Sequence, residues 1–156
     1  MTYQVCVGVD GTAAAEAALR LAVEDAALHG GEVLVLTAWS SPDALPGTAD
    51  AEAIVHRQTA TKIQDTAIER VLEGVSDPPR IERAVVLGSA REELVRRSRR
   101  ADRLVVGTEH KGILKRIVDG SVSRYCVRHA QIPVIVVPHI APGLADLGAP
   151  EALEES

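Results

Sequence analysis

Nine residues separate Val105-Val106-Gly107-Thr108-Glu109-His110 from Gly120-Ser121-Val122-Ser123, and these two segments indicate the architecture of the chain. The apolar run at 104–106 predicts a buried strand that ends at a glycine, and the second segment predicts the start of a helix over 121–129. A strand, a glycine turn and a helix N-terminus direct backbone N–H groups toward a common point. The pattern therefore predicts an anion site beside the carboxyl end of a strand.

Strand and helix patterns alternate along the rest of the 156 residues. Apolar runs predict strands at 5–9, 33–38, 81–87, 104–106 and 133–137. Periodicity and capping residues predict helices at 12–29, at 51–72, from 89 onward and at 121–129, where Ser89-Ala90-Arg91-Glu92 has the spacing of a capping box. Because crossovers are right-handed, we expect a doubly wound α/β fold of the flavodoxin or Rossmann kind. Its five-stranded parallel sheet has the order 3-2-1-4-5, with two helices on each face.

The composition supports this fold and excludes several functions. Hydrophobic residues make up 46% of the chain and aromatic residues only 2%, so the core is aliphatic, as in a parallel sheet covered on both faces. The scarcity of aromatic rings argues against binding nucleic acid by base stacking, and the net charge of −5 argues against binding to phosphate backbones. We therefore expect no nucleic-acid partner.

The length predicts one domain, over 1–138, followed by a flexible acidic tail over 139–156. No apolar run approaches the length of a membrane span, so no membrane partner is expected. The N-terminus enters a strand without a charged leader, which predicts a cytoplasmic protein. Cys6 is expected to be a small core residue and Cys126 to lie on a helix, and a disulfide or two-cysteine metal site is not expected. No His/Cys/Asp cluster has the spacing of metal ligands, so no metal-ligating residue is predicted.

Five arginines lie in or just after the third predicted helix. They alternate with Glu92, Glu93 and Asp102, which favours a solvated helix face over a site for an acidic partner. These arginines are Arg91, Arg96, Arg97, Arg99 and Arg100.

In a doubly wound sheet, ligands bind where the winding reverses, here between the first and fourth strands. Asp10 and Gly107 end these two strands. The Asp10 carboxylate is suited to accept hydrogen bonds from ribose hydroxyls or an adenine amino group. Alternatively, Asp10 or Thr12 caps the following helix, and Asp10 taken alone favours the cap.

These motifs, taken in order, resemble the universal stress protein family. The resemblance covers residues 3–138 and rests on spacing as much as on any one motif. Its segments are Val7 to Thr12, Val33 to Trp39, Val85 to Glu93, Leu104 to Thr108, Gly120 to Ser123 and Pro133 to Pro138.

The resemblance implies a crevice for ATP or AMP, with Mg²⁺ accompanying ATP. It assigns adenosine contacts to Asp10 and to the backbone of Ala38. It assigns phosphate and ribose contacts to Gly107, Gly120, Ser121, Val122 and Ser123.

The chain departs from the family's nucleotide-binding motif at one position. That motif reads Gly-x-x-Gly-x9-Gly-(Ser or Thr), and His110 replaces its second glycine. A glycine permits positive φ and close approach of the backbone to phosphate, whereas an imidazole occupies space. His110 is therefore either a changed phosphate contact or a loop residue without a role. Charges of both signs surround it: Glu109 and Asp119, and Lys111, Lys115 and Arg116.

The last strand is an apolar edge, which invites pairing, and the resemblance implies a homodimer through Val134, Ile135, Val136 and Val137. Two functions follow. The first is a nucleotide-binding stress-response module that acts through a partner protein, and the second is a nucleotide-free homodimeric interaction protein. An enzyme such as a slow ATPase ranks last, and no catalytic residue is predicted. Asp10 and Asp119 are the only candidate Mg²⁺ carboxylates, and Ser121 has no evident His–Asp partner.

Overall fold

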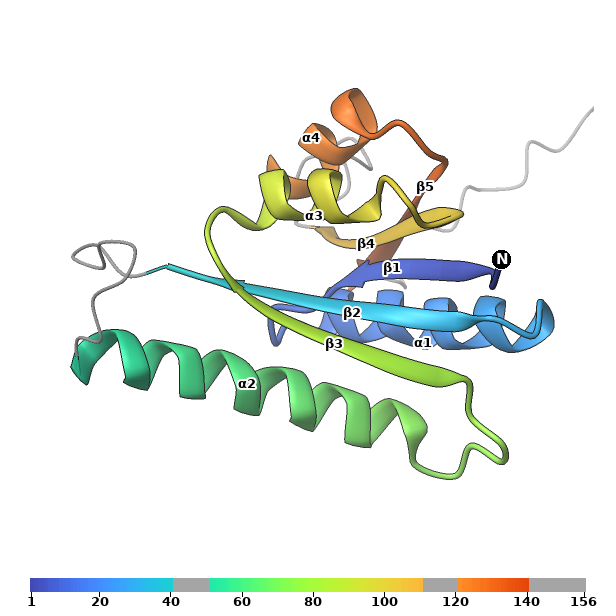
Figure 1. Cartoon of the computed structure of the whole chain (residues 1–156), viewed down its shortest axis with the longest axis horizontal. Helices are drawn as coiled ribbons and strands as arrows, with labels where there is room; N and C mark the ends of the chain where they lie inside the picture. The colour runs from blue at the N-terminus through green and yellow to red at the C-terminus, as the bar shows by residue number, and fades with distance from the viewer. Residues whose placement is uncertain (41–50, 111–120, 141–156) are drawn as a thin grey trace, which may run out of the picture.

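The computed structural model describes residues 1–40, 51–110 and 121–140, and every structural statement below refers to these residues. Its five strands form one parallel sheet in the order β3-β2-β1-β4-β5 (Figure 1). The predicted fold and strand order are therefore confirmed. The elements are β1 (Gln4–Gly8), α1 (Ala13–Leu28), β2 (Glu32–Trp39), α2 (Ala51–Leu72), β3 (Arg80–Leu87), α3 (Ala90–Ser98), β4 (Arg103–His110), α4 (Ser121–His129) and β5 (Val134–Ile140).

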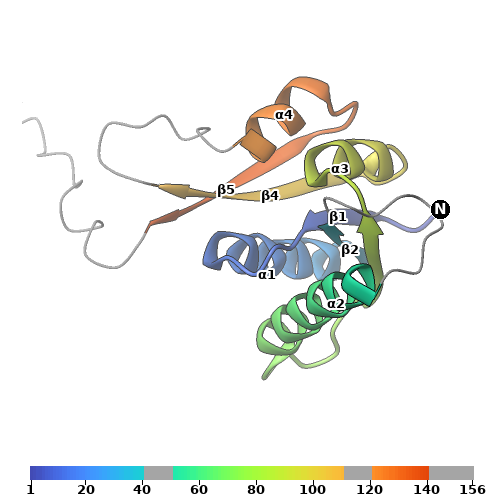
Figure 2. The same ribbon diagram turned by 90° about the vertical axis from the view of Figure 1, so that its left-hand side faces the viewer.

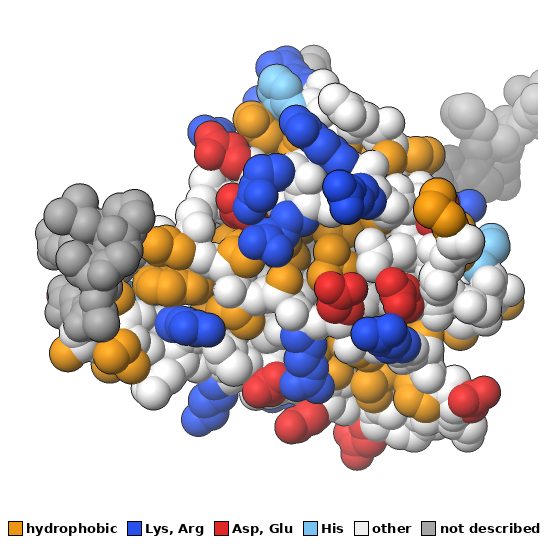
Figure 3. All heavy atoms as spheres, viewed as in Figure 1, with side chains coloured by type: hydrophobic (Ala, Val, Ile, Leu, Met, Phe, Trp, Pro, Cys, Tyr) orange, Lys and Arg blue, Asp and Glu red, His pale blue; other side chains and the backbone are white. Residues whose placement is uncertain are grey.

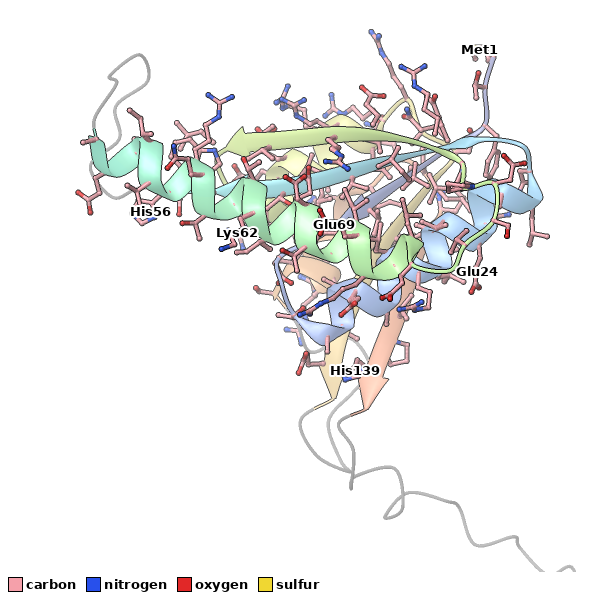
Figure 4. All side chains as sticks on the ribbon, turned by 90° about the horizontal axis from the view of Figure 1, so that it is seen from below. Met1, Glu24, His56, Lys62, Glu69 and His139 are labelled. Carbon is pink, nitrogen blue, oxygen red and sulfur yellow. The ribbon has the colours of Figure 1, made fainter. Side chains whose placement is uncertain are left out.

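The sheet lies between two helical layers, with α1 and α2 on one face and α3 and α4 on the other (Figure 2). Alternate strand residues feed two separate aliphatic clusters because successive side chains point to opposite faces. Val5, Val7 and Val105 pack under α1, while Cys6 and Leu104 pack under α3 and α4. All five of these residues are fully buried. On the outer surface of α2, Lys62 and Glu69 are directed away from the sheet (Figure 4).

The central strand is shorter than its neighbours at the carboxyl end of the sheet. Gly8, the last residue of β1, is level with Leu36, and β2 continues beside β3 to Trp39. On the other side, β4 pairs with β1 only as far as Val105, which lies opposite Val7. From there β4 continues beside β5 to His110. The sheet therefore has a notch beyond the carboxyl end of β1. The paired strands β2 and β3 lie on one side of this notch, and the paired strands β4 and β5 lie on the other.

The fourth strand is longer than the sequence predicts, and this corrects the assignment of Gly107 to a turn. Gly107 lies inside β4 and pairs with Val137, and Thr108 continues the strand as a buried, β-branched residue. A β-carbon at position 107 would lie 2.9 Å from the amide nitrogen of Ala15, and closer still to the carbonyl of Ala14. The glycine is needed because the first turn of α1 packs directly on the strand.

The predicted capping box of α3 is also wrong. Ser89 is the N-cap residue, but its side chain makes no capping hydrogen bond. Glu93, the residue after the predicted capping-box glutamate, accepts hydrogen bonds from Arg96, at 2.6 Å, and Arg97, at 3.1 Å. These two bonds stabilise the middle of the helix through pairs spaced three and four residues apart.

At its other end the chain shows two further features. β5 runs to Ile140, two residues past the predicted domain end at 138, and residues 141–156 of the predicted tail lie outside the described residues. Within the described ranges, none of the helices combines the length and apolar character that crossing a bilayer demands. Cys6 is buried, as predicted, Cys126 is buried on α4, and both thiols are free. Burial raises the pKa of the Cys6 thiol to about 12 and that of Cys126 to about 11.

Candidate functional site

A small cavity of about 90 Å³ lies at the notch above β1. It brings together four of the eight predicted site residues from three strand ends and one helix start. Asp10 follows β1, Ala38 belongs to β2, Gly107 to β4 and Val122 to α4. The crevice predicted at the reversal of the winding is therefore present. The other lining residues are Gly8, Val9, Thr12, Ala15, Leu36, Ala90, Leu94 and Val106.

The sequence left two roles open for Asp10, capping of the following helix and contact with a ligand, and in the structure Thr12 takes the capping role. Thr12 is the N-cap of α1, and its Oγ1 accepts a hydrogen bond from the Ala15 amide at 3.2 Å. Asp10 holds Thr12 in place, because its Oδ1 accepts from the Thr12 amide at 3.0 Å and from the Thr12 hydroxyl at 2.7 Å. In the described part of the chain both hydrogen bonds of Asp10 use Oδ1. Oδ2 of this exposed carboxylate is therefore available to a ligand.

A buried polar network supports the end of β1, and the sequence analysis did not identify it. The hydroxyl of Thr37 donates to the carbonyl of Val9 at 2.8 Å. Behind it, Nε2 of Gln64 lies 3.1 Å from Thr37 Oγ1 and 3.1 Å from the carbonyl of Ala84. Gln64 is only 1% exposed. The network fixes Val9, and so determines the direction in which the chain leaves the sheet toward Asp10.

A signal for this network was present in the sequence. Gln64 shares the buried face of α2 with Ala60, Ala67, Ile68 and Val71. A polar side chain at helical spacing among apolar ones predicts a buried hydrogen-bonding residue.

The start of α4 borders the same crevice. Ser121 is its first helical residue and is exposed, Val122 lines the cavity, and Ser123 is 1% exposed. Of the two predicted phosphate-binding hydroxyls, that of Ser121 therefore lies at the surface and that of Ser123 lies in the interior. Gly120 lies outside the described residues, as do Lys111, Lys115, Arg116 and Asp119.

His110 is the last residue of β4 and pairs with Ile140. The sequence analysis placed it in a loop, and the structure corrects this. A strand backbone is one that any residue adopts without cost. The conformational argument for a glycine at position 110 therefore does not apply to this structure.

The described part of the crevice is smaller than a typical ligand pocket. Its 90 Å³ compares with about 300 Å³ or more for sites that enclose small molecules. Leu94 of α3 closes the floor, and its Cδ1 lies 2.9 Å from the position that a β-carbon on Gly8 would take. The notch thus suits part of a ligand, such as one ring system, while the rest lies across the strand ends.

The fold and the site together define a doubly wound α/β protein with a ligand crevice between β1 and β4, of the kind that binds mononucleotides. The family model described as "Universal stress protein family" matches residues 1–138. The chain belongs to the universal stress protein family.

Individual relatives agree with this assignment. Universal stress protein Rv2005c of Mycobacterium tuberculosis is 34% identical over 134 residues, which cover 85% of this chain and 44% of the relative. A universal stress protein from Archaeoglobus fulgidus in complex with dAMP is 25% identical with a TM-score of 0.63, covering 88% of this chain and 99% of that one. A family member from Burkholderia pseudomallei is 26% identical with a TM-score of 0.64, covering 88% and 97%. The chain spans less than half the length of the curated relatives it matches.

Proposed function

We propose that this chain is a stress-response module that binds an adenine nucleotide, AMP or ATP, in the crevice between β1 and β4 and signals through a partner protein. One observation carries the proposal: Asp10, Ala38, Gly107 and the start of α4 line one cavity at the notch. The dAMP complex of the relative from Archaeoglobus fulgidus supports an adenine nucleotide as the ligand. In this proposal the module binds the nucleotide and passes the signal to a partner protein, and we assign it no catalytic step.

The described residues fit the nucleoside better than the phosphates. Oδ2 of Asp10 is suited to accept from an amino group or a ribose hydroxyl, and Ala38 lines the same cavity. The α4 N-terminus and the exposed Ser121 offer donors to a phosphate. Mg²⁺ would accompany ATP as its counter-ion.

Calorimetric titration with AMP and with ATP in the presence of Mg²⁺ tests the proposal. We expect saturable binding, weakened in Asp10→Asn. That substitution keeps an acceptor for Thr12 but replaces the second carboxylate oxygen with an amide donor. Asp102→Asn is the matched control, since Asp102 lies outside the crevice and accepts a hydrogen bond from the Gln4 amide at 2.8 Å. Absence of heat at about 1 mM nucleotide would contradict the proposal.

A second candidate function is a nucleotide-free interaction protein that forms a homodimer through β5. The small volume of the described crevice favours it, as does His110 at the motif's second glycine position. Among the described strands, β5 pairs with β4 alone, and Val134, Ile135, Val136 and Val137 are each only partly buried. An apolar strand edge of this kind is suited to pair with a second copy. The homodimer is also compatible with nucleotide binding, so calorimetry rather than the oligomeric state separates the two functions.

A further inference from the structure

A second hollow, larger than the crevice, lies along the edge of the sheet that β3 forms. A groove of about 880 Å³ runs along β3, and six arginines from three parts of the chain line it. They come from α2, from β3, and from α3 with the turn after it: Arg57, Arg83, Arg96, Arg97, Arg99 and Arg100. Lys and Arg side chains gather visibly over α3 (Figure 3). In a chain with a net charge of −5, this concentration of positive charge is a local feature that the composition does not predict.

Half of these arginines already have an ion-pair partner. Arg83 pairs with Asp65, while Arg96 and Arg97 share Glu93. For Arg57, Arg99 and Arg100, no ion pair occurs within the parts of the chain that the structure describes. Glu82 is the one carboxylate among the lining residues. The groove therefore retains a surplus of guanidinium groups, which bind planar carboxylates through paired hydrogen bonds.

The floor of the groove is apolar. Leu34, Ala84 and Val86 line it, and the last two are only partly buried. They belong to the cluster under α3 and α4, but α3 packs on β1, β2 and β4. None of the helices in the described ranges covers the end of that face over β3. Apolar surface beside charged walls is typical of a site for a peptide rather than for a free ion.

The backbone of β3 offers hydrogen-bonding groups along this groove. The Gly88 amide donates to the carbonyl of Trp39 at 2.9 Å, so even-numbered residues of β3 face β2. The N–H and C=O groups of Arg83 and Val85 therefore point away from β2. Within the described chain β3 pairs with β2 alone, so these groups lie at the open edge of the sheet. An open edge is a template for an added strand.

We propose that the β3 groove is a docking site for an extended acidic peptide of a partner protein, which adds a sixth strand beside β3. Its backbone pairs with Arg83 and Val85. Alternate side chains of a strand point to opposite faces, so acidic residues on the α2 face meet Arg57, while apolar residues on the α3 face cover Val86 and Ala84. This site is separate from the nucleotide crevice and does not depend on it.

The observations favour a peptide over a nucleic acid. Only 2% of the residues are aromatic, and none of the described residues that line the groove is aromatic, so these residues offer no stacking platform for bases. An apolar floor contributes nothing to binding phosphates, whereas an apolar floor and a strand edge together contribute to binding a peptide in extended conformation.

Fluorescence anisotropy tests the proposal with the full chain and a labelled peptide of alternating glutamate and valine, about eight residues long. We expect saturable binding that weakens with salt, and no binding of the matching glutamine–valine peptide. Arg57→Glu is expected to weaken binding by about tenfold or more, because it reverses one unpaired charge. Arg20→Glu, on the exposed surface of α1, is the matched control and is expected to have no effect.

A second variant tests the strand pairing. Val85→Pro removes an outward N–H while leaving the hydrogen bonds to β2 intact, and proline is tolerated at a sheet edge. We expect about tenfold weaker binding with an unchanged circular dichroism spectrum. If Val85→Pro fails to fold, the Arg57→Glu result still decides the charge dependence.

Three results would overturn the proposal. One is equal binding of the acidic and the glutamine peptides, and another is tighter binding of a single-stranded oligonucleotide than of the acidic peptide. The third result would be evidence that the chain's own acidic segment, 141–156, occupies the groove. If removing this segment raises peptide affinity about tenfold, the groove serves that segment and not a partner.

Discussion

Gly107 of β4 lies directly against Ala14 in the first turn of α1, with the strand and the helix backbone in contact. This contact gives the glycine a structural role that does not depend on any ligand. It also determines how close α1 comes to the crevice, because Thr12 and Asp10 precede that turn.

Replacing Gly107 with alanine is expected to destabilise the protein by about 1–3 kcal/mol, because the new methyl group would overlap backbone atoms that cannot move aside. Urea denaturation measures the change. Gly8→Ala is the matched control: its β-carbon would meet only the Leu94 side chain, whose end can rotate, so we expect a smaller loss. Equal stability of Gly107→Ala and the parent protein would contradict this account of the packing.

The buried amide of Gln64 predicts a second stability effect. Gln64→Leu removes the hydrogen bonds to Thr37 and to the carbonyls of Val35 and Ala84. We expect a loss of about 1–3 kcal/mol in the free energy of unfolding, because buried polar groups lose a partner. Gln58→Leu, on the exposed side of the same helix, is expected to change stability by less than about 0.5 kcal/mol. Similar effects from the two variants would show that the network contributes nothing.

His110→Gly is expected to strengthen ATP binding. The change removes an imidazole from the end of β4 and restores a residue that lets the backbone approach phosphate. Calorimetry compares the variant with the parent chain. His139→Gly, at the end of the neighbouring strand β5, is the control and is expected to leave affinity unchanged. Unchanged or weaker ATP binding in His110→Gly would refute the link between this histidine and the phosphate site.

The Cys6 thiol predicts a loss of stability in alkali. Burial raises its pKa from 9.0 to about 12, so the unfolded chain releases the thiol proton first as the pH rises. Its contribution to stability is intact below about pH 9 and is lost as the pH rises toward about 12. Urea unfolding across this range measures the slope. The pKa of Tyr3 is raised too, mainly by burial, so the comparison with Cys6→Ala isolates the thiol. An identical pH slope in both proteins would contradict the prediction.

The homodimer gives a fifth prediction. Sedimentation at micromolar concentration is expected to show a dimer, and Val136→Lys is expected to shift it toward monomer because a charge on an edge strand opposes pairing. Val75→Lys, an exposed position after α2, is the matched control. A monomer in the parent chain would exclude the β5 interface.

The strand order and most element boundaries follow from local sequence patterns. Periodicity and caps predicted each helix and strand to within a few residues, because the apolar faces repeat regularly. The residues at the tips of the strands were harder. The polar run Thr108-Glu109-His110 lacks a strand pattern, and it continues β4 because Pro138, His139 and Ile140 lie alongside it. Pairing over some thirty residues of sequence leaves no local signal.

The candidate site could be predicted only in part, because some of its residues are brought together by contacts that leave no local signal. Asp10 and Ala38 end short apolar strands, where topology alone brings residues together. The arginine groove was not foreseen, because Arg57, Arg83 and Arg100 are far apart in the sequence and meet only when α2, β3 and α3 are assembled. The interleaved acidic residues indicated a solvated helix face, and only the structure shows that Glu93 pairs with just two of the arginines.

The shortness of β1 also has a mechanical consequence. Its seam with β4 joins three residue pairs, from Val5–Arg103 to Val7–Val105, whereas the outer seam between β2 and β3 joins eight. The least reinforced line of the sheet therefore passes through the crevice. A ligand that contacts both β1 and β4 would add interactions across this weakly paired boundary. Its binding would therefore stabilise the sheet against local opening there.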